Sequence, residues 1–471
     1  MKLGALTGGS EAAVVTGFAI DHRKVAPGTI FGAFRGMRVN GEDYIADAVR
    51  SGAIAVVAAP DVAVAGALHI AHDNPRECFA HLAARFFAPF PQTAVAVTGT
   101  NGKTSTVEMT RQLWRMAGFH AASIGTLGVT TADERVTTGL TTPDVVTFLS
   151  NVAGLAREGV SHLAFEASSH GLTQYRTEGL SVCAAAFTNL TRDHLDYHGD
   201  MGAYLTAKLR LFSEVLAPGG TAVVWADDDS AGRVVDLAHA RGNRLMTVGT
   251  RGQTLRLVDR DPTPLGQGLR IEAEGVMHQV ALPLIGAYQA ANALVAAGLV
   301  IATGGDTRAT LASLARLQPV RGRLERATIT RSGAPVYVDY AHTPDALEAA
   351  IAALKPHADG RLIVAFGAGG DRDAGKRGVM GQVAITQADL VIVTDDNPRT
   401  EDAAAIRRHI LDGAPGAREI GDRREAIATA VAEARSNDIV LIAGKGHEQG
   451  QIVGDMVLPF DDVAVARTCA A

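Results

Sequence analysis

The stretch Thr98-Gly99-Thr100-Asn101-Gly102-Lys103-Thr104-Ser105 decides the fold of the central part of this chain. It follows the apolar run Ala94-Val95-Ala96-Val97, which we expect to be a buried parallel strand, and it precedes residues 107–114, which we expect to be helical. Strand, Gly-rich loop, Lys-Thr and helix together form a phosphate-binding loop whose backbone N–H groups face phosphate oxygens. Lys103 adds a cation, and the Thr104 hydroxyl can reach Mg²⁺. Generic loops of this kind have glycine at the position of Val97, so this is a compact form.

Length and composition indicate a globular protein of about three ordinary domains. The chain has 471 residues, of which 47% are hydrophobic and 20% charged, and its 44 basic and 50 acidic residues give a net charge of −6. This balance does not favour binding to nucleic acid or to a membrane surface. The spacing of Cys78, Cys183 and Cys469 suggests neither a zinc site nor a disulfide framework. We find no signal core and no membrane-spanning stretch, and we expect a soluble, cytoplasmic monomer.

Prolines and strand patterns divide the chain into three predicted domains, at residues 1–90, 91–318 and 319–471. The first boundary follows from the two prolines in the stretch 87–91, and the second lies near Pro319. We expect an α/β fold with a central P-loop ATPase-like parallel sheet and a C-terminal Rossmann-like α/β domain. In the third domain the predicted strands are residues 362–366, 390–394 and 439–443. Each runs into a polar or Gly-rich loop, where ligands of open α/β sheets gather.

Three weaker signals lie in the central domain. Glu166 follows the predicted strand 162–165 and could hold Mg²⁺ or cap the next helix, and the local sequence favours neither. The stretch Thr188–Gly199 contains two His and two Asp within six residues; alone it favours a solvated loop with a capping Asp over a charged site. Lys208, taken by local spacing only, is an ordinary lysine on an amphipathic helix.

In combination these signals form an ordered set of motifs that extends over nearly the whole chain. The set includes Glu166-Ala167-Ser168-Ser169-His170-Gly171-Leu172, Thr188–Gly199, Ala207–Phe212, Gly286–Leu294, Val320–Glu325, Val338–Asp345 and Gly444–Glu448. With the compact phosphate loop, it resembles the Mur ligases, which are ATP-dependent amino-acid-adding enzymes of peptidoglycan precursor synthesis. The resemblance implies the same activity and the same three-domain fold.

The resemblance also implies where ATP and metal are bound. The implied ATP-binding residues are Gly99, Thr100, Asn101, Gly102, Lys103, Thr104, Ser105, Asn292, Arg323, Asp339 and His342. The implied Mg²⁺ ligands are Thr104, Glu166, His194 and Lys208, the last as a carbamate formed with CO₂. Adding CO₂ turns an ammonium, which repels Mg²⁺, into a carboxylate-like group that binds it. Lys103, His194 and Lys208 are the implied catalytic residues.

The amino acid that is added is suggested by Asp396-Asn397-Pro398-Arg399, which follows the predicted strand 390–394. This loop resembles that of the family members that add meso-diaminopimelate, whereas lysine-adding relatives lack the arginine. A guanidinium can hold the far carboxylate of diaminopimelate bidentately. The same four letters at Asp73–Arg76 predict only a helix start, with Asn or Asp near the cap and Pro in the first turn. The implied amino-acid-binding residues are Arg372, Asp396, Asn397, Pro398, Arg399, Gly444 and Glu448.

The acceptor is a UDP-N-acetylmuramoyl dipeptide. Fewer residues of this chain match the family's acceptor-binding residues than match its ATP-binding residues. The implied binding residues are His22, Thr141, Thr142, Ser168, Gln174 and Arg176. The first domain departs from the family pattern, with Asp21-His22-Arg23 where Asp-Ser-Arg is usual and Asn40-Gly41-Glu42 where Asp-Gly-His is usual. We therefore expect UDP binding by this domain and leave its individual contacts open.

The expected reaction activates a carboxylate. ATP phosphorylates the D-glutamate side chain, the amine of diaminopimelate attacks the acyl phosphate, and phosphate leaves. His194 and the phosphate itself are both candidates for the proton acceptor. A lysine-adding relative is disfavoured by Arg399, and a folylpolyglutamate synthase by Thr141-Thr142-Pro143 and the Asp-Asn-Pro-Arg loop. An inactive nucleotide-sugar-binding scaffold should have lost Lys103, Glu166 or Lys208, and all three are present. Nothing in the sequence suggests a switch or motor NTPase.

Overall fold

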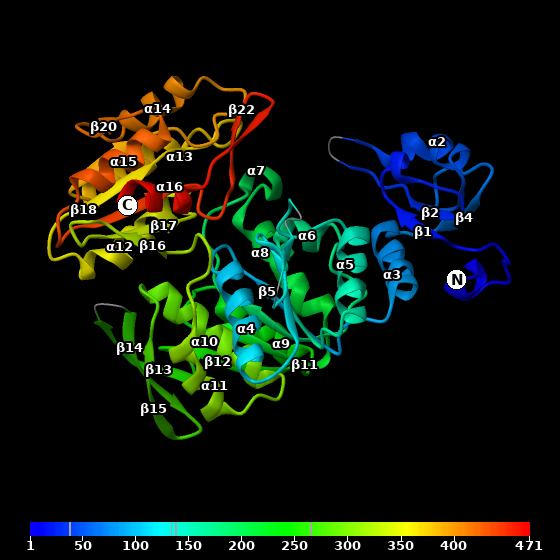
Figure 1. Ribbon diagram of the computed structural model, residues 1–471. Helices are drawn as coiled ribbons and strands as arrows, with labels where there is room; N and C mark the ends of the chain where they lie inside the picture. The colour runs from blue at the N-terminus through cyan, green and yellow to red at the C-terminus, as the bar shows by residue number, and fades with distance from the viewer. Residues whose placement is uncertain (37–38, 133, 137–138, 264–265) are drawn as a thin grey trace. The chain divides into compact units, whose positions relative to one another are not determined.

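A computed structural model of the chain describes residues 1–36, 39–132, 134–136, 139–263 and 266–471 (Figure 1). Two compact units are present. The first comprises residues 1–254 and 295–306, and the second comprises residues 255–294 and 307–471. Both units consist of sheets with helices along the chain between their strands, which confirms the predicted α/β class.

The first unit opens with a parallel sheet in the order β1-β2-β3-β4. The elements of this part are α1 (Leu3–Thr7), β1 (Gly17–Ala19), η1 (His22–Lys24), β2 (Thr29–Gly32), η2 (Gly41–Tyr44), α2 (Ile45–Arg50), β3 (Ala53–Ala58), β4 (Leu68–Ala71) and α3 (Pro75–Phe87). Helix α3 begins as its sequence predicts, because the Asn74 side chain accepts the N–H of Glu77 and Pro75 fills the first turn. It packs beside helix α5 (Figure 1).

A second sheet of the first unit carries the phosphate loop, and its strand order there is β12-β11-β10-β5-β9-β6-β7-β8. The strands from β12 to β6 pair in parallel, and β7 and β8 are antiparallel additions. The elements are β5 (Thr93–Thr98), α4 (Lys103–Met116), β6 (Ala121–Gly125), β7 (Gly128–Thr130), β8 (Arg135–Val136), α5 (Val145–Arg157), β9 (His162–Glu166), α6 (Ser169–Thr173), β10 (Val182–Phe187), α7 (Leu195–His198), α8 (Met201–Arg210), η3 (Leu211–Val215), β11 (Leu216–Trp225), α9 (Ala231–Ala240) and β12 (Arg244–Gly249).

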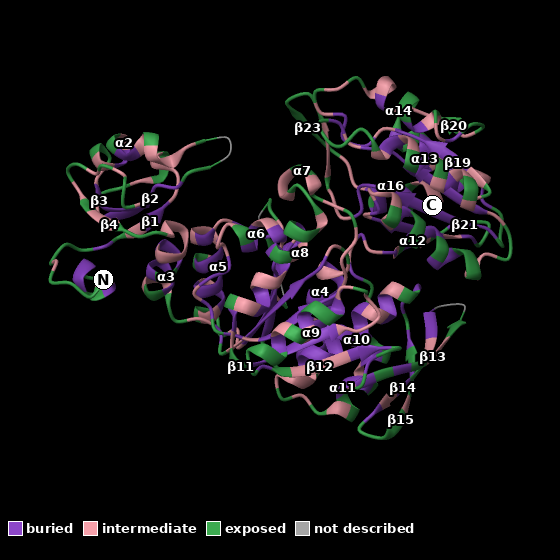
Figure 2. Ribbon diagram, turned by 180° about the vertical axis from the view of Figure 1, so that it is seen from behind, coloured by how far each residue is buried: buried purple, intermediate pink, exposed green. Residues whose placement is uncertain are grey.

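Continuous apolar runs explain the centre of this sheet. Strands β5, β9 and β10 are buried along almost their whole length, as expected of parallel strands covered on both faces (Figure 2). The predicted strand at 94–97 is therefore confirmed as β5. The predicted helix is confirmed as α4, although it begins four residues earlier, at Lys103.

The second unit contains a mainly parallel sheet in the order β16-β17-β21-β18-β19-β20, in which only β16 is antiparallel to its neighbour. The elements, with α10 continuing past the boundary between the units, are β13 (Leu255–Thr263), β14 (Gly266–Ala273), β15 (Val276–Leu282), α10 (Ala287–Ala302), α11 (Thr307–Ser313), η4 (Leu314–Arg316), β16 (Glu325–Ile329), β17 (Pro335–Asp339), α12 (Pro344–Leu354), η5 (Lys355–His357), β18 (Leu362–Phe366), α13 (Lys376–Gln387), β19 (Leu390–Val393), α14 (Ala403–Leu411), β20 (Arg418–Glu419), α15 (Arg423–Glu433), β21 (Ile439–Ala443), β22 (Gly450–Val453), β23 (Met456–Pro459) and α16 (Asp462–Ala470).

The three strands predicted in the C-terminal part are confirmed. Strands β18 and β21 have the predicted bounds, and β19 ends one residue earlier, at Val393. The loops that follow them leave the same edge of the sheet, because these strands are parallel. Among the described residues, no helix has the length and apolar character needed to cross a bilayer.

Candidate active site

The phosphate loop follows β5, and helix α4 begins at its lysine. The Lys103 ammonium donates to the carbonyl oxygens of Gly99 at 2.9 Å and Thr100 at 2.8 Å. Gly99 has a φ of +149°, and a Cβ at this position would lie 1.9 Å from the Thr188 hydroxyl oxygen. Only glycine therefore allows the loop to approach the neighbouring segment so closely.

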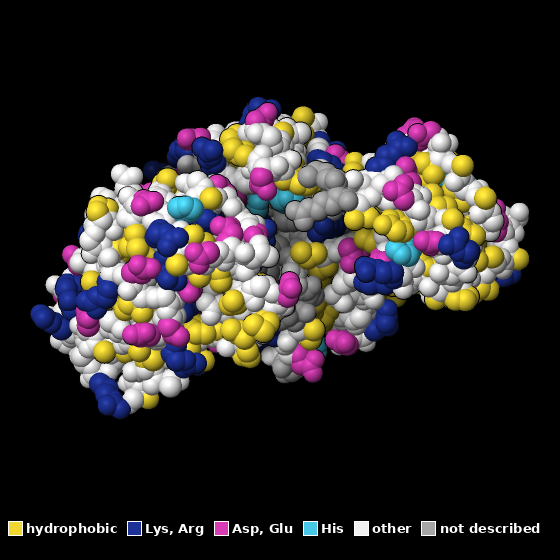
Figure 3. Space-filling model, turned by 90° about the horizontal axis from the view of Figure 1, so that it is seen from above, with side chains coloured by type: hydrophobic (Ala, Val, Ile, Leu, Met, Phe, Trp, Pro, Cys, Tyr) yellow, Lys and Arg dark blue, Asp and Glu magenta, His cyan; other side chains and the backbone are white. Residues whose placement is uncertain are grey.

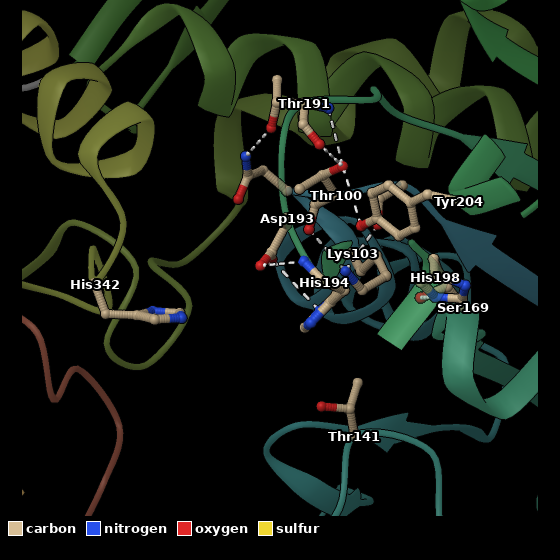
Figure 4. Close-up of polar contacts among 12 residues, drawn as sticks. Thr100, Lys103, Thr141, Ser169, Thr191, Asp193, His194, His198, Tyr204 and His342 are labelled. Atoms are coloured by element: carbon tan, nitrogen blue, oxygen red, sulfur yellow. Dashed lines mark hydrogen bonds and ion pairs between the residues drawn. The ribbon is translucent and has the colours of Figure 1, made fainter. Parts of the chain in front are cut away.

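That neighbouring segment, residues 188–191, fixes the loop from the end of strand β10. The Thr188 hydroxyl donates to the Asn101 carbonyl at 2.6 Å, and the Asn189 side chain accepts the Asn101 N–H at 2.8 Å. The Thr100 hydroxyl donates to the Thr191 carbonyl at 3.2 Å (Figure 4). The solvated loop that the local sequence favours is therefore wrong for this segment. Asn189 and Thr191 stand in the quoted motif, yet only the fold shows their role.

Lys208 is buried, with 1% of its surface exposed, so it is not the ordinary lysine of an amphipathic helix that local spacing favours. Its ammonium nitrogen lies 2.8 Å from the Gly99 carbonyl oxygen, which Lys103 also contacts, and 4.2 Å from the centre of the Tyr204 ring. Burial, reinforced by Lys103, lowers the pKa of Lys208 well below its usual range, although Asp193 opposes the shift. Tyr204, which sequence reasoning missed, also donates to the Thr100 hydroxyl at 3.2 Å (Figure 4).

Glu166 ends strand β9, in register with Val97, the second-last residue of β5, and is 2% exposed. Its two carboxylate oxygens accept the Thr126 N–H at 2.7 Å and the Thr126 hydroxyl at 3.2 Å. Helix α6 is capped instead by the Ser168 side chain, which accepts the Gly171 N–H at 3.0 Å. The capping alternative for Glu166 is therefore wrong. Thr126 carried no sequence signal.

His194 takes a left-handed backbone conformation, with a φ of +54°, immediately before helix α7. Its ring nitrogen Nε2 lies 3.4 Å from an oxygen of Asp193, and its ring lies 4.9 Å from that of His170. The His194 side chain is 46% exposed, yet desolvation of the ring by the surrounding groups lowers its pKa. The nearby Lys103 and Lys208 add to this effect, and Asp193 opposes it. Figure 4 shows His194 beside Lys103 in the cluster around Thr100 and Tyr204.

The residues expected to hold the dipeptide part of the acceptor form one hydrogen-bonded chain next to Glu166. The Thr142 hydroxyl donates to the Glu166 carbonyl at 2.9 Å and accepts the Ser168 N–H at 3.1 Å. Arg176 donates to the Thr142 carbonyl at 2.8 Å and to the Gln174 side-chain oxygen at 2.7 Å. The remaining contacts involve the hydroxyls of Thr141 and Thr126, 3.0 Å apart, and the Gln174 amide with the Tyr197 hydroxyl, 3.2 Å apart. His22 lies apart from this chain and stacks on Tyr44, with ring centres 4.4 Å apart.

In the second unit, the residues expected to bind the amino acid meet in the loops after β18, β19 and β21. Arg399 has a φ of +53°, fixed by backbone hydrogen bonds with Ile452 and Gly454 of hairpin β22–β23, and its guanidinium donates to the Gly370 carbonyl at 2.7 Å. Gly444 has a φ of +112°, and a Cβ there would lie 2.4 Å from a carboxylate oxygen of Asp396. The other members of the predicted set are the buried Asn397 and Pro398, the partly exposed Glu448 and the exposed Arg372.

The second unit also holds the predicted nucleotide residues outside the phosphate loop. Asp339 is 7% exposed and accepts the Leu324 N–H at 2.6 Å; burial raises its pKa to about 6, although Arg323 opposes the shift. The Arg323 guanidinium stacks over the Tyr340 ring at 4.6 Å, and the Tyr340 carbonyl is 2.8 Å from a ring nitrogen of His342. Asn292 is buried on α10 and donates to the Gln289 side chain at 3.4 Å, and Gln289 in turn donates to the Arg323 carbonyl at 2.9 Å.

The chain belongs to the Mur ligase family, a class of ATP-dependent amide ligases. Three family models match it in order: the Mur ligase family catalytic domain at residues 14–87, the Mur ligase middle domain at 97–300, and the Mur ligase glutamate ligase domain at 322–446.

Named relatives cover almost the entire chain. UDP-N-acetylmuramoyl-L-alanyl-D-glutamate--2,6-diaminopimelate ligase of Zymomonas mobilis is 60% identical, over 96% of this chain and 94% of its own length. The protein of that name from Bradyrhizobium diazoefficiens is 51% identical, over 100% and 99%. A solved structure of a 2,6-diaminopimelate ligase with the same full name superposes with a TM-score of 0.74 at 32% identity, covering 100% of this chain and 98% of the other.

Proposed function

We propose that this protein uses ATP to add meso-diaminopimelate to the D-glutamate side-chain carboxylate of UDP-N-acetylmuramoyl-L-Ala-D-Glu. The products are UDP-N-acetylmuramoyl-tripeptide, ADP and phosphate, and the reaction belongs to peptidoglycan precursor synthesis. The observation that carries this assignment is the place of Arg399, which is held by the Gly370 carbonyl in the loop after β19, where Asn397 contacts Glu448. The names of relatives at 60% and 51% identity agree with it.

The first step transfers the γ-phosphoryl group of ATP to the carboxylate. We assign the phosphates to the loop Gly99–Ser105, whose amides and Lys103 offset negative charge during the transfer. The remaining ATP contacts are assigned to Asn292, Arg323, Asp339 and His342. A bond from carboxylate oxygen to phosphorus forms as the bond to the ADP oxygen breaks, which gives an acyl phosphate and ADP.

The second step forms the amide. The neutral amine of diaminopimelate attacks the acyl carbon, and phosphate leaves with the bonding electrons of its C–O bond. The amine must lose one proton, and His194 or the departing phosphate is the proposed acceptor. His194 is a candidate because a neutral imidazole nitrogen can accept a proton.

Mg²⁺ suits the residues around the phosphate loop, where it would neutralise phosphate charge. Its proposed ligands are Thr104, Glu166, His194 and Lys208 carrying a carbamate. Among the described residues no group of three or more His, Cys, Asp and Glu could hold a metal by itself, so Glu166 needs further oxygen donors. The burial of Lys208 supports its modification, because burial favours the neutral amine and CO₂ adds to an amine that has lost its proton.

The two other substrates have separate sets of proposed contacts. Thr141, Thr142, Ser168, Gln174 and Arg176 would bind the dipeptide part of the acceptor, and His22 the nucleotide part. The proposed diaminopimelate contacts are Arg372, Asp396, Asn397, Pro398, Arg399, Gly444 and Glu448. We further propose domains at 1–90, 91–318 and 319–471, a monomeric state and a cytoplasmic location.

The deciding experiment measures phosphate release with ATP, Mg²⁺ and UDP-N-acetylmuramoyl-L-Ala-D-Glu across a panel of amino acids. We expect meso-diaminopimelate to be used far better than L-lysine, with formation of the UDP-tripeptide confirmed by mass. Turnover with L-lysine and not with meso-diaminopimelate would assign the protein to the lysine-adding relatives. Phosphate release without any added amino acid would instead indicate an ATPase.

A further inference from the structure

A buried lysine contacts two residues of the proposed diaminopimelate site, Asn397 and Glu448. The side chain of Lys445, in the loop after β21, is 0% exposed. Its ammonium nitrogen is 2.9 Å from the Asn397 side-chain oxygen, 3.0 Å from Glu448 Oε2 and 4.0 Å from Asp396 Oδ1. A buried ammonium is costly unless such oxygens surround it. Here they come from two separate loops, so Lys445 joins the loop after β19 to the loop after β21.

The contacts of Lys445 also determine how the Asn397 amide is oriented. The side-chain oxygen of Asn397 accepts from Lys445 and from the Ile452 N–H at 2.9 Å, so this atom faces two donors. The amide nitrogen must then point the other way, and it donates to Glu448 Oε2 at 2.8 Å. Asn397 is 4% exposed, whereas the Glu448 side chain is 30% exposed. Of the two residues, Glu448 is therefore the one placed to meet a ligand.

We infer that Lys445 is a positioning residue that holds Asn397 and the Glu448 carboxylate in place for the far ammonium of the incoming amino acid. This inference rests on the proposed function, which places diaminopimelate against Glu448. Charge supports it as well. Asp396 and Glu448 carry two negative charges, and Lys445 balances one of them. Among these three side chains one net negative charge is left, which matches one ligand ammonium. Arg423, which also faces both carboxylates, is paired with Asp462.

The experiment compares Lys445→Met, Lys445→Arg and the control Lys355→Met, which removes an exposed lysine of the same unit. Phosphate release with UDP-N-acetylmuramoyl-L-Ala-D-Glu gives the KM for meso-diaminopimelate and for ATP separately. We expect Lys445→Met to raise the KM for diaminopimelate by about tenfold or more and to leave the KM for ATP unchanged. Lys445→Arg, which keeps the charge, should recover part of the loss, and Lys355→Met should match the parent.

A double-mutant cycle with Glu448→Gln separates positioning from a general structural role. If Lys445 acts through Glu448, adding Lys445→Met to the Glu448→Gln protein should cost much less affinity than it costs in the parent. Calorimetric titration with meso-diaminopimelate measures this even for a variant with little turnover. Additive losses, or an unchanged KM for diaminopimelate in Lys445→Met, would overturn the inference. A parent protein that does not consume diaminopimelate at all would instead overturn the proposed function.

Discussion

Arg399 shows how the choice of substrate can depend on one side chain. Its left-handed backbone is fixed on both sides by hairpin β22–β23, and one of its guanidinium nitrogens is fixed by the Gly370 carbonyl. The fork is therefore preorganised for a planar anion such as a carboxylate. Diaminopimelate has a carboxylate on its far carbon and lysine does not. In the proposed site, only diaminopimelate can therefore pair that far carboxylate with this arginine.

Replacing Arg399 by alanine should narrow the preference for meso-diaminopimelate over L-lysine. Losing one charge-assisted pair costs roughly 1.5–3 kcal/mol, and this should appear in kcat/KM for diaminopimelate only. Arg408→Ala, which removes an exposed arginine of helix α14, is the control and should keep the parental ratio. Equal use of the two amino acids by the parent would refute this role of Arg399.

Lys208 supports a second prediction at the residue scale. Lys208→Ala should be nearly inactive, and short carboxylates such as formate or acetate should restore part of its activity by replacing the carbamate. Thr206→Ala, an exposed position of the same helix, should behave like the parent. Mass spectrometry of the intact parent in bicarbonate offers an independent measurement. Full activity of Lys208→Ala would exclude the carbamate.

Three lysines, Lys103, Lys208 and Lys445, show how much of the site could be predicted from the sequence. The glycines, strand and helix around Lys103 all lie within a few residues of it in the sequence. Its position in a phosphate-binding loop could therefore be predicted. Lys208 contacts a carbonyl 109 residues away, and Lys445 contacts Asn397 at a separation of 48 residues. Local spacing describes neither contact. Only the resemblance to a family therefore singles out Lys208, and the sequence assigns Lys445 no role.

At the scale of elements, a buried ion pair connects the last two helices with the amino-acid loops. Arg423 of α15 and Asp462 of α16 are both 0% exposed and lie 2.7 Å apart. Arg423 also donates to the Asp395 carbonyl after β19 at 3.2 Å and to the Ala443 carbonyl at the end of β21 at 3.0 Å. The pair therefore links the ends of two strands that β18 separates.

Breaking this pair should destabilise the second unit strongly. Arg423→Met leaves the Asp462 charge buried and unpaired, which costs about 3–5 kcal/mol, whereas Arg423→Met combined with Asp462→Leu should cost less than the single change. Chemical denaturation measures both values. Arg424→Met, at the exposed neighbouring position, is the control. A double variant less stable than Arg423→Met would contradict the explanation.

The ion pair between Glu178, in the turn after α6, and Arg210, at the end of α8, should make stability depend on pH. Burial raises the pKa of Glu178 to about 7, although Arg210, 3.2 Å away, opposes the shift. The folded protein therefore holds this proton more tightly than the unfolded chain, and the resulting stability, present below pH 4.5, is lost as pH rises through 7.

Glu178→Gln cannot lose a proton and should escape this loss. Between pH 4.5 and 8, the free energy of unfolding of the parent should fall relative to that of Glu178→Gln by about 3 kcal/mol. Denaturant titrations of both proteins at each pH give the difference, in which other titrating groups cancel. A difference independent of pH would show that the carboxylate ionises as freely in the folded protein as in the unfolded chain.

The elements themselves were largely predictable from the sequence. Strands β18 and β21 are short runs of branched apolar residues followed by polar loops, and their bounds agree with the prediction. Residues 188–191 show the limit of this approach. Their polar composition is typical of a solvated loop, and their hydrogen bonds to Thr100 and Asn101 exist only because β10 and β5 are neighbours in the sheet.

At the scale of the whole molecule, the proposed anionic substrates are matched by single cations and not by a basic surface. The net charge is −6, and on the face shown in Figure 3 basic and acidic side chains are interspersed. A few cationic side chains, such as Lys103 and Arg176, are sufficient to bind small anions, because hydrogen bonds to backbone carbonyls hold these side chains in place. Nucleic acid would require a continuous basic face.

Binding of ATP should stabilise the first unit, which holds the phosphate loop. The loop exists only when β5 and α4 are folded, so ATP binds the native protein and not the unfolded chain. At a hundredfold excess over its Kd, ATP with Mg²⁺ should add about 2.7 kcal/mol to the free energy of unfolding and raise the thermal midpoint. Lys103→Ala should lose most of this gain and Lys355→Ala none, and chelating the Mg²⁺ should reduce it for the parent. An equal rise of the midpoint in Lys103→Ala and in the parent would show that ATP is held elsewhere.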